Sequence, residues 1–381
     1  MHIAINGHLI AHSNSFRRAG ISNYSEEIIR ALGTIDRRNR YSVYTTRGLD
    51  LHQLNLPSNF KVKPNLFHTI NPRVRIPWEH LVAPLLLRAT KADIYHGMHV
   101  AMPLFCPVPA VVTVHDLAPM SFPQTFRGYN RTYLNWSARV TGRNAKHILA
   151  VSEFTKRELM RLLDVPAERI TVTPNACDER FKPASPAEIA QFRSRVGLPE
   201  RFILFVGTLE PRKNLPNLLE AFAKIATRTD APLIIGGGKG WMYDRIFSRL
   251  EELNLKDRVH FPGFLASEDL PLWYAAASVF VFPSRWEGFG IPPLEAMACG
   301  TPVVSSNRSS LPEVVGDAGL MVDPEDIDGM GEAILRILND KDLAQELRER
   351  GLQQAKRFSW KTSAERTLKV YEEVYQRYVR S

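Results

Sequence analysis

The sequence has little cysteine and no long hydrophobic run, and both absences argue against whole classes of protein. Its three cysteines, Cys106, Cys177 and Cys299, are widely spaced and odd in number. This argues against a disulfide framework or a cysteine metal cluster and is typical of a reducing cytoplasm. The longest apolar stretches, such as Leu81 to Leu87 with Pro84 inside it, fall far short of the ~20 residues that span a bilayer. We therefore expect a cytoplasmic protein.

The sequence also shows no pattern typical of an export signal and no low-complexity tract. Its first residues, Met1 to Gly7, predict a strand and a turn, and they have neither the basic start nor the apolar stretch of a secretory signal. The chain has 381 residues, which is more than one hydrophobic core usually covers. We therefore expect two domains.

Short runs of β-branched residues alternate with longer helical patterns, which indicates βα units and parallel sheets. The predicted strands are residues 3–6, 41–45, 94–96, 110–114 and 147–151 in the first half, and 202–206, 233–235, 259–261, 279–282 and 303–305 in the second. We predict an α/β fold of two doubly wound, Rossmann-like domains. A proline-bearing stretch between Thr173 and Glu200 predicts the boundary, which gives domains at 1–182 and 183–358.

Positive charge is concentrated in the first domain. Residues 1–182 hold 24 Lys and Arg against 13 Asp and Glu, a net charge of +11, whereas the remaining residues hold 25 against 27, a net charge of −2. A field of one sign indicates an anionic partner, such as phospholipid headgroups or a phosphorylated acceptor. Nucleic acid is not expected, since no helix-turn-helix, zinc-finger or RNP pattern accompanies the charge. A merely soluble basic face is the alternative.

Four arginines of this half recur at multiples of four on a predicted helix: Arg127, Arg131, Arg139 and Arg143. Each step of four residues advances about 40° around a helix, so the set covers a broad flank. It is a candidate surface for acidic lipid or a diphosphate-bearing acceptor. A solvated helix face is the alternative.

The segment from residue 286 to residue 300 carries two carboxylates, Glu287 and Glu295, separated by seven residues. Pro292 and Pro293 suit a helix start, because a proline there loses no backbone hydrogen bond. Gly300 suits the left-handed position that ends a helix. Glu287 is therefore predicted on a loop and Glu295 inside a short helix.

The same loop offers backbone donors beside the carboxylates. The amides of Phe289 and Gly290, together with the helix N-terminus, are favourable for phosphate, and Gly288 beside them belongs to the same candidate site. The two carboxylates are acceptors suited to sugar hydroxyls. This combination predicts a nucleotide-sugar site.

The segment resembles the Glu-x7-Glu motif of retaining glycosyltransferases of family four, which have the GT-B fold. The resemblance continues through residues 301–305 and 310–316 and extends over almost the whole chain. It implies two Rossmann-like domains facing a cleft, a nucleotide-diphosphate sugar bound by the second domain, an acceptor bound by the first, and no metal. It also implies that residues 359–381 form a last helix that returns to the first domain, and an ordinary terminal helix of the second domain is the alternative.

Arg212 and Lys213 follow the first strand of the second domain. Ligands bind at the carboxyl ends of strands in open α/β sheets, and two cations can neutralise a diphosphate without a metal. The pair resembles the pyrophosphate-binding pair of the family, although Gly207 and Thr208 stand where many members have Gly-Arg. Thr208 is therefore also expected in the donor-binding loop.

Three further glycine-containing segments belong to the expected donor site or its edge. Gly20 resembles the family's glycine-rich loop against the donor phosphate, and Gly263 with Phe264 resembles the segment whose backbone meets the nucleotide base. The glycine run at 236–240 lacks phosphate-loop spacing and predicts a turn at a strand end.

His115 and Asp116 follow a buried strand of the first domain, where His115 can hydrogen-bond a sugar hydroxyl and Asp116 can orient it. Family resemblance places His115 near the transferred sugar, and a satisfied structural pair is the alternative. The resemblance also implies that Glu287 holds sugar hydroxyls and Glu295 the ribose. Arg212 and Lys213 would stabilise the departing diphosphate.

The expected reaction is transfer of a hexose, with mannose from GDP-mannose as the first choice, onto a glycan or polyprenyl-diphosphate-linked acceptor in polysaccharide biosynthesis. A UDP- or dTDP-linked donor is an alternative. A non-hydrolysing sugar-nucleotide epimerase shares the architecture and would act without an acceptor. A sugar-binding protein would show no turnover.

Overall fold

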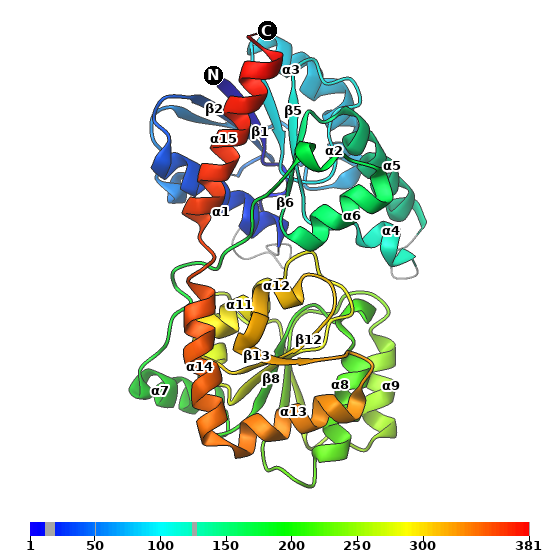
Figure 1. Cartoon of the computed structure of the whole chain (residues 1–381), viewed down its shortest axis with the longest axis vertical. Coiled ribbons are helices and arrows are strands. Elements are labelled where there is room, and N and C mark those ends of the chain that lie inside the picture. The colour runs from blue at the N-terminus through cyan, green and yellow to red at the C-terminus, as the bar shows by residue number, and fades with distance from the viewer. Residues whose placement is uncertain (12–19, 50, 124–127, 381) are drawn as a thin grey trace. The chain divides into compact units, whose positions relative to one another are not determined.

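The computed structural model describes residues 1–11, 20–49, 51–123 and 128–380 (Figure 1). The chain forms two compact units. The first comprises Met1–Asn175 together with Ser359–Ser381, and the second comprises Ala176–Phe358. Each contains one parallel sheet with helices in the connections, in agreement with the α/β prediction. Among the described residues, every helix is too short or too polar to span a lipid bilayer.

The first unit is built on a seven-stranded sheet in the order β3-β2-β1-β4-β5-β6-β7. Its strands are β1 (His2–Asn6), β2 (Arg40–Thr45), β3 (Phe60–Pro64), β4 (Ile94–Gly97), β5 (Ala110–Val114), β6 (His147–Ala150) and β7 (Ile170–Val172). Its helices are α1 (Ile21–Ile35), η1 (His52–Leu54), α2 (Pro72–Pro77), the π-helix η2 (Trp78–Val82), α3 (Ala83–Ala89), α4 (Ala118–Ser121), α5 (Gly128–Asn144), α6 (Glu153–Leu163), η4 (Ala167–Arg169) and α15 (Trp360–Tyr378).

The second unit is built on a six-stranded sheet in the order β10-β9-β8-β11-β12-β13. Its strands are β8 (Ile203–Val206), β9 (Leu233–Gly236), β10 (Val259–Gly263), β11 (Val279–Phe282), β12 (Val303–Ser306) and β13 (Gly319–Val322). Its helices are α7 (Pro186–Val196), η5 (Pro211–Lys213), α8 (Leu215–Ile225), α9 (Asp244–Glu252), α10 (Leu270–Ala276), α11 (Ile291–Ala298), α12 (Leu311–Val315), η6 (Gly316–Ala318), α13 (Ile327–Asn339) and α14 (Lys341–Ala355).

The last helix, α15, belongs to the first unit and packs beside α1 on its sheet (Figure 1). Its buried Tyr371 hydroxyl bonds Nδ1 of His96 in β4. Arg366 Nη1 donates to the carbonyl oxygen of Val172 over 2.9 Å. These hydrogen bonds tie α15 to strands β4 and β7 of the first unit.

The boundary between the units lies seven residues before the predicted one. The chain enters the second unit at Ala176, because residues 176–182 pack there. The ring of Phe181 lies 6.0 Å from that of Tyr274, and Arg180 donates to the Ser267 carbonyl oxygen over 2.9 Å. With this division the first unit holds 27 basic and 14 acidic residues, a net charge of +13, and the second holds 22 and 26, a net charge of −4.

Strand order reverses once in each sheet. In the first unit the reversal lies between β1 and β4, and in the second it lies between β8 and β11. Connections leave these neighbouring strands in opposite directions, so a crevice opens at their carboxyl ends, which is where open α/β sheets bind ligands. Functional residues are therefore expected in the loops at these two strand reversals.

Candidate functional site

An ion-pair cluster joins the two loops at the strand reversal of the second unit. Arg212 and Lys213 follow β8, and Glu287 follows β11. Lys213 Nζ lies 2.6 Å from Glu287 Oε1, and Arg212 Nη1 lies 2.7 Å from Glu287 Oε2. Arg212 also donates to the Trp286 carbonyl oxygen over 2.7 Å and to Glu210 Oε1 from Nη2 over 2.6 Å. The predicted phosphate-binding cations and the predicted sugar-binding carboxylate therefore form one cluster.

Burial and neighbouring charges shift the pKa values of this cluster in opposite directions. Burial raises the pKa of Glu287, but the charges of Arg212 and Lys213 outweigh it and lower that pKa to about 2. Burial lowers the pKa of Lys213, and Glu287 opposes the shift only in part. The carboxylate is therefore ionised at neutral pH. The Lys213 ammonium also lies 4.6 Å from the centre of the Phe282 ring.

Two serines fix the loop that carries Glu287. Ser309 Oγ accepts the backbone N–H of Glu287 over 3.0 Å. Ser310 Oγ lies within hydrogen-bond distance of the carbonyl oxygens of Glu287, at 2.9 Å, and Phe289, at 2.6 Å. Sequence reasoning gave these serines no role. Their position directly after β12, the neighbour of β11, is the signal that was available.

The helix after this loop begins and ends as predicted. Gly290 precedes α11 with φ of +110°, and an added Cβ would lie 2.6 Å from Leu311 Cδ2, so only glycine fits. Gly300 has φ of +75°, and the N–H groups of Gly300 and Thr301 bond the carbonyl oxygens of Met297 and Ala296. This is a Schellman motif, which satisfies the last carbonyls of α11.

Glu295 differs from Glu287 in its protonation. It is buried in α11, and its Oε2 accepts a hydrogen bond from the Tyr274 hydroxyl over 2.9 Å. Burial raises the pKa of Glu295 to about 7, with Tyr274 opposing the rise. The carboxyl is therefore divided between its neutral and ionised forms near pH 7. It can act as a donor as well as an acceptor, which the sequence prediction of a ribose acceptor did not include.

The glycine run after β9 extends the sheet beyond its predicted end. Leu209 N–H donates to the Gly238 carbonyl oxygen over 2.9 Å, and Gly237 N–H donates to the Gly263 carbonyl oxygen over 2.8 Å. A Cβ on Gly237 would lie 1.9 Å from the carbonyl oxygen of Gly207. The loops after β8, β9 and β10 are therefore linked by their backbones.

This linkage brings three predicted donor-site positions to the same carboxyl edge as the ion-pair cluster. Thr208 is exposed in the loop after β8. Gly263 ends β10 with φ of +81°, and the Phe264 side chain beside it is 61% exposed. The large exposed ring is therefore available for contact with a planar ligand, and its role stays a prediction.

In the first unit, His115 follows β5 and is half-buried. Burial lowers its pKa to about 4, and its Nε2 donates to the Met98 carbonyl oxygen over 3.0 Å. The imidazole is therefore neutral, with Nδ1 as an acceptor. Asp116 Oδ1 accepts the backbone N–H of Ala118 over 2.9 Å. The Met98 carbonyl orients the His115 ring, whereas Asp116 stabilises the turn into α4.

The other predicted residues of the first unit lie on helices. Gly20 is exposed at the start of α1 with φ of +24°, and an added Cβ would meet no atom within 4 Å. Arg131, Arg139 and Arg143 are all exposed on α5. Arg127 lies outside the described residues.

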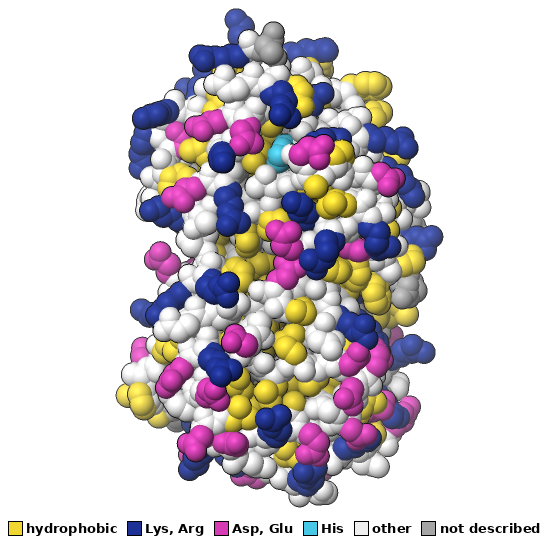
Figure 2. Space-filling model, viewed as in Figure 1, with side chains coloured by type: hydrophobic (Ala, Val, Ile, Leu, Met, Phe, Trp, Pro, Cys, Tyr) yellow, Lys and Arg dark blue, Asp and Glu magenta, His cyan; other side chains and the backbone are white. Residues whose placement is uncertain are grey.

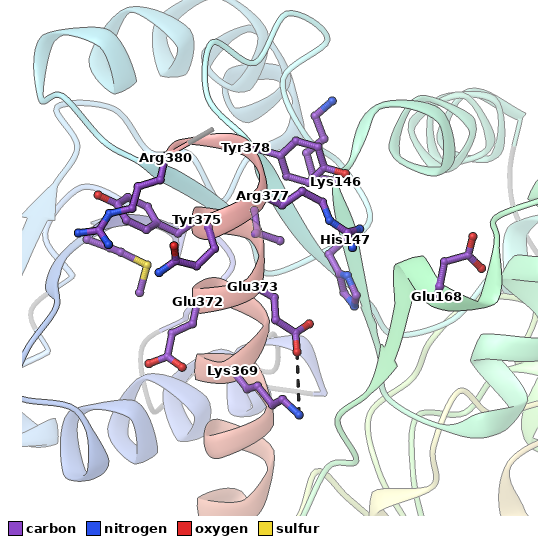
Figure 3. A pocket seen from close by; sticks show the side chains of 13 residues that line it. Lys146, His147, Glu168, Lys369, Glu372, Glu373, Tyr375, Arg377, Tyr378 and Arg380 are labelled. Atoms are coloured by element: carbon purple, nitrogen blue, oxygen red, sulfur yellow. Dashed lines mark ion pairs between the residues drawn. The ribbon is translucent and has the colours of Figure 1, made fainter.

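A separate hollow lies beside α15 (Figure 3). It is lined by Met1, Lys146 and His147 together with side chains of that helix, including Glu373. Met1 precedes β1, and Lys146 and His147 stand at the beginning of β6, so the hollow lies at the amino ends of the strands. Ligands of doubly wound sheets bind at the opposite, carboxyl edge, so we do not assign the hollow to the reaction.

Comparison with known proteins gives a family for both units. A family model described as "Glycosyltransferase Family 4" matches residues 18–181, and one described as "Glycosyl transferases group 1" matches residues 187–354. O-antigen chain mannosyltransferase B of Escherichia coli is 41% identical over 288 residues, which are 75% of each chain.

Solved structures agree on the fold. Sucrose-phosphate synthase from Thermosynechococcus elongatus is similar with a TM-score of 0.80 and 22% identity over 99% of each chain. Anabaena HepE, solved in complex with UDP-glucose, is similar with a TM-score of 0.76 and 21% identity over 98% of this chain and 100% of HepE. These likenesses confirm the predicted GT-B fold. Among the described residues, no group of three or more His, Cys, Asp or Glu could hold a metal ion.

Proposed function

The chain belongs to glycosyltransferase family 4, and we propose that it transfers mannose from GDP-mannose, with retention of configuration, to a glycan or polyprenyl-diphosphate-linked acceptor in polysaccharide biosynthesis. The observation that carries the proposal is the cluster of Arg212, Lys213 and Glu287 at the strand reversal of the second unit. The 41% identity to an O-antigen mannosyltransferase supports mannose, and the UDP-glucose bound to HepE supports a nucleotide sugar.

The cluster suits a reaction in which negative charge develops on a leaving group. As the bond between the anomeric carbon and the diphosphate breaks, charge grows on the diphosphate and competes with Glu287 for the cations. Arg212 and Lys213 therefore bind the departing diphosphate more strongly than the bound donor. Glu287, partly released from them, accepts hydrogen bonds from sugar hydroxyls. The acceptor oxygen forms the new bond on the same face, and the diphosphate takes up its proton.

We also propose that the first unit works at an acidic membrane surface on the cytoplasmic side. Residues 61–152 hold 11 Lys and Arg but only three Asp and Glu, of which Glu79 is fully buried. Basic side chains are spread over the face of this unit that Figure 2 shows. The same stretch carries large exposed apolar side chains: Leu81, Val82, Leu85, Leu104, Phe105 and Trp136.

Part of this apolar set gathers around His80. The His80 ring lies 5.3 Å from the Trp136 ring, and its Nδ1 accepts the backbone N–H of Leu104 over 3.2 Å. Arg139 and Arg143 follow Trp136 at three and seven residues along α5, so they share its side of the helix. Apolar side chains flanked by cations fit the headgroup region of an anionic bilayer.

A thermal-shift panel of GDP, UDP, dTDP and ADP tests the donor. A nucleotide at about 100 times its Kd adds about 2.7 kcal/mol of stability, so the true donor base gives the largest shift. A shift with UDP or dTDP alone would replace GDP-mannose as the donor. Replacing both Arg212 and Lys213 with alanine should lower turnover more than it lowers affinity for the sugar nucleotide. Full activity in this variant would refute the proposed role of the cluster.

Incubation of the enzyme with GDP-mannose and no acceptor tests the epimerase alternative. A glycosyltransferase leaves the sugar configuration of the nucleotide sugar unchanged. Conversion to a second nucleotide sugar, detected by anion-exchange chromatography, would favour the epimerase.

A further inference from the structure

The strand reversal of the first unit carries a polar cluster to which the proposed reaction assigns no role. His8 stands two residues after β1, His99 two residues after β4, and His115 one residue after β5. These three strands are neighbours in the sheet and run parallel. Three histidines therefore arrive at one carboxyl edge, at the point where doubly wound sheets bind ligands.

A buried carboxylate lies among these histidines. Glu79, in the π-helix η2, is 0% exposed, and its Oε1 lies 3.0 Å from His99 Nε2. Asn6 Nδ2 donates to the same oxygen over 3.3 Å, and the Tyr133 hydroxyl donates to Oε2 over 3.3 Å. Burial raises the pKa of Glu79, but His99 and Arg75 outweigh it, so the net shift is downward and the group is ionised.

Nitrogen atoms beside this carboxylate lack partners. His8 is 0% exposed and His99 is 5% exposed. In the part of the chain that the structure describes, neither ring nitrogen of His8 has a hydrogen-bond partner, and neither does His99 Nδ1. Burial lowers the pKa of His8 to about 3, so its ring is neutral with one donor and one acceptor. Buried polar groups are almost always paired, so these atoms indicate a polar ligand or water.

We propose that the cluster of Asn6, His8, Glu79 and His99 binds an uncharged sugar residue at the end of the acceptor. The proposal rests on the proposed function, because it names the acceptor side of the same reaction. A sugar hydroxyl both donates and accepts, and this matches a neutral imidazole. A phosphate does not match, because the buried Glu79 carboxylate would repel it.

The edge of the cluster gives a ligand access from solvent. Arg75, Tyr133 and His115 are all partly exposed, whereas His8, Glu79 and His99 lie beneath. A terminal hexose can therefore contact the exposed groups through one side and His99 through a hydroxyl. This arrangement fits a site that recognises one sugar residue of a longer chain.

Binding can be tested without activity by titrating the full-length protein with methyl α-mannoside and methyl α-glucoside. The imidazole C–H resonances would be followed by NMR and assigned with single histidine variants. The resonances of His8 and His99 should shift saturably. His147, at the amino edge of the same sheet with its Nε2 2.8 Å from Thr171 Oγ1, is the control and should not shift. Absence of any shift at His8 and His99 would leave bound water as the explanation and overturn the proposal.

Two substitutions of His99 distinguish the roles of its two ring nitrogens. Gln places an amide near the Nε2 position, facing Glu79, and Asn places one near the Nδ1 position. His99→Gln should raise the KM for the acceptor about tenfold, the effect of one lost hydrogen bond, and leave the KM for the donor unchanged. His99→Asn should raise it less. An unchanged acceptor KM in His99→Gln would overturn the proposal. Absence of transfer by the wild-type enzyme would instead refute the proposed function.

Discussion

Replacing Glu287 and Glu295 in turn with glutamine should have opposite effects on the stability of the fold near neutral pH. Glutamine represents the neutral carboxyl in both cases. Glu287 has a pKa of about 2 against an ordinary value of 4.5, and Glu295 has a pKa of about 7 against the same value. Each shift, at about 1.4 kcal/mol per pKa unit, corresponds to about 3 kcal/mol. Both side chains are less than a tenth exposed, so solvent screening reduces these values little.

The direction of each pKa shift determines whether ionisation of the carboxyl stabilises or destabilises the fold. The folded pKa of Glu287 is depressed, so its ionisation stabilises the fold above about pH 4.5 and the contribution is lost as pH falls toward 2. Glu287→Gln should therefore be less stable than wild type by about 3 kcal/mol throughout pH 5–8. The folded pKa of Glu295 is raised, so ionisation destabilises the fold progressively from about pH 4.5 to about 7. Glu295→Gln should therefore gain stability relative to wild type over that range.

Calorimetry of the second unit at pH 5, 6, 7 and 8 measures both effects. A loss of about 3 kcal/mol lowers the midpoint of a unit of this size by roughly 6–12 °C. Glu287→Gln should show that loss at every pH. Glu295→Gln should be close to wild type at pH 5 and more stable at pH 8. If the stability of the two variants relative to wild type followed parallel pH profiles, the opposite pKa shifts assigned to Glu287 and Glu295 would be refuted.

Three further changes test other parts of the structure. Gly290→Ala should destabilise the second unit by about 1–3 kcal/mol, because the backbone is left-handed and the new Cβ meets Leu311. Gly197→Ala is the control and should cost less stability, because that left-handed position has open space around it. Equal urea midpoints for the two variants would contradict this reasoning. Activity should survive EDTA, and a loss that only a divalent ion restores would contradict the expectation that the reaction needs no metal. Protein should sediment with acidic liposomes, release as salt rises from about 0.1 M to about 1 M, and bind less when Arg127, Arg131, Arg139 and Arg143 become glutamine. Arg228, Arg308 and Arg350, exposed in the second unit, form the control set, and equal sedimentation with neutral liposomes would favour a soluble basic face.

The sequence was sufficient to predict the interior strands of both sheets. All ten predicted strands appear, because parallel strands covered on both faces are continuous apolar runs. Three strands were not predicted: β3, β7 and β13. All three lie at sheet edges: β3 is mixed in polarity, β7 has only 3 residues, and β13 begins with a glycine, a residue that is depleted in strands. Local pattern therefore does not distinguish them from loops.

The candidate site was predictable only where its residues lie in a recognisable string. Glu287 and Glu295 lie in one motif, but the contact of Glu287 with Arg212 and Lys213 spans more than 70 residues and depends on the order of strands. The cluster around Glu79 gave no signal, because His8 and His99 are isolated residues in separate loops. Only the adjacency of β1 and β4 shows that they meet.

The charge of a whole unit is a poor guide to the charge of its crevice. The second unit is net negative, yet its strand reversal holds the cations Arg212 and Lys213. The first unit carries a net charge of +13, yet its reversal holds an ionised Glu79 beside the neutral imidazole of His8. In the two proposals made for this unit, long-range attraction to anions and short-range recognition of hydroxyls therefore belong to different surfaces. A variant without the α5 arginines should consequently lose membrane attachment and keep its affinity for a small neutral sugar.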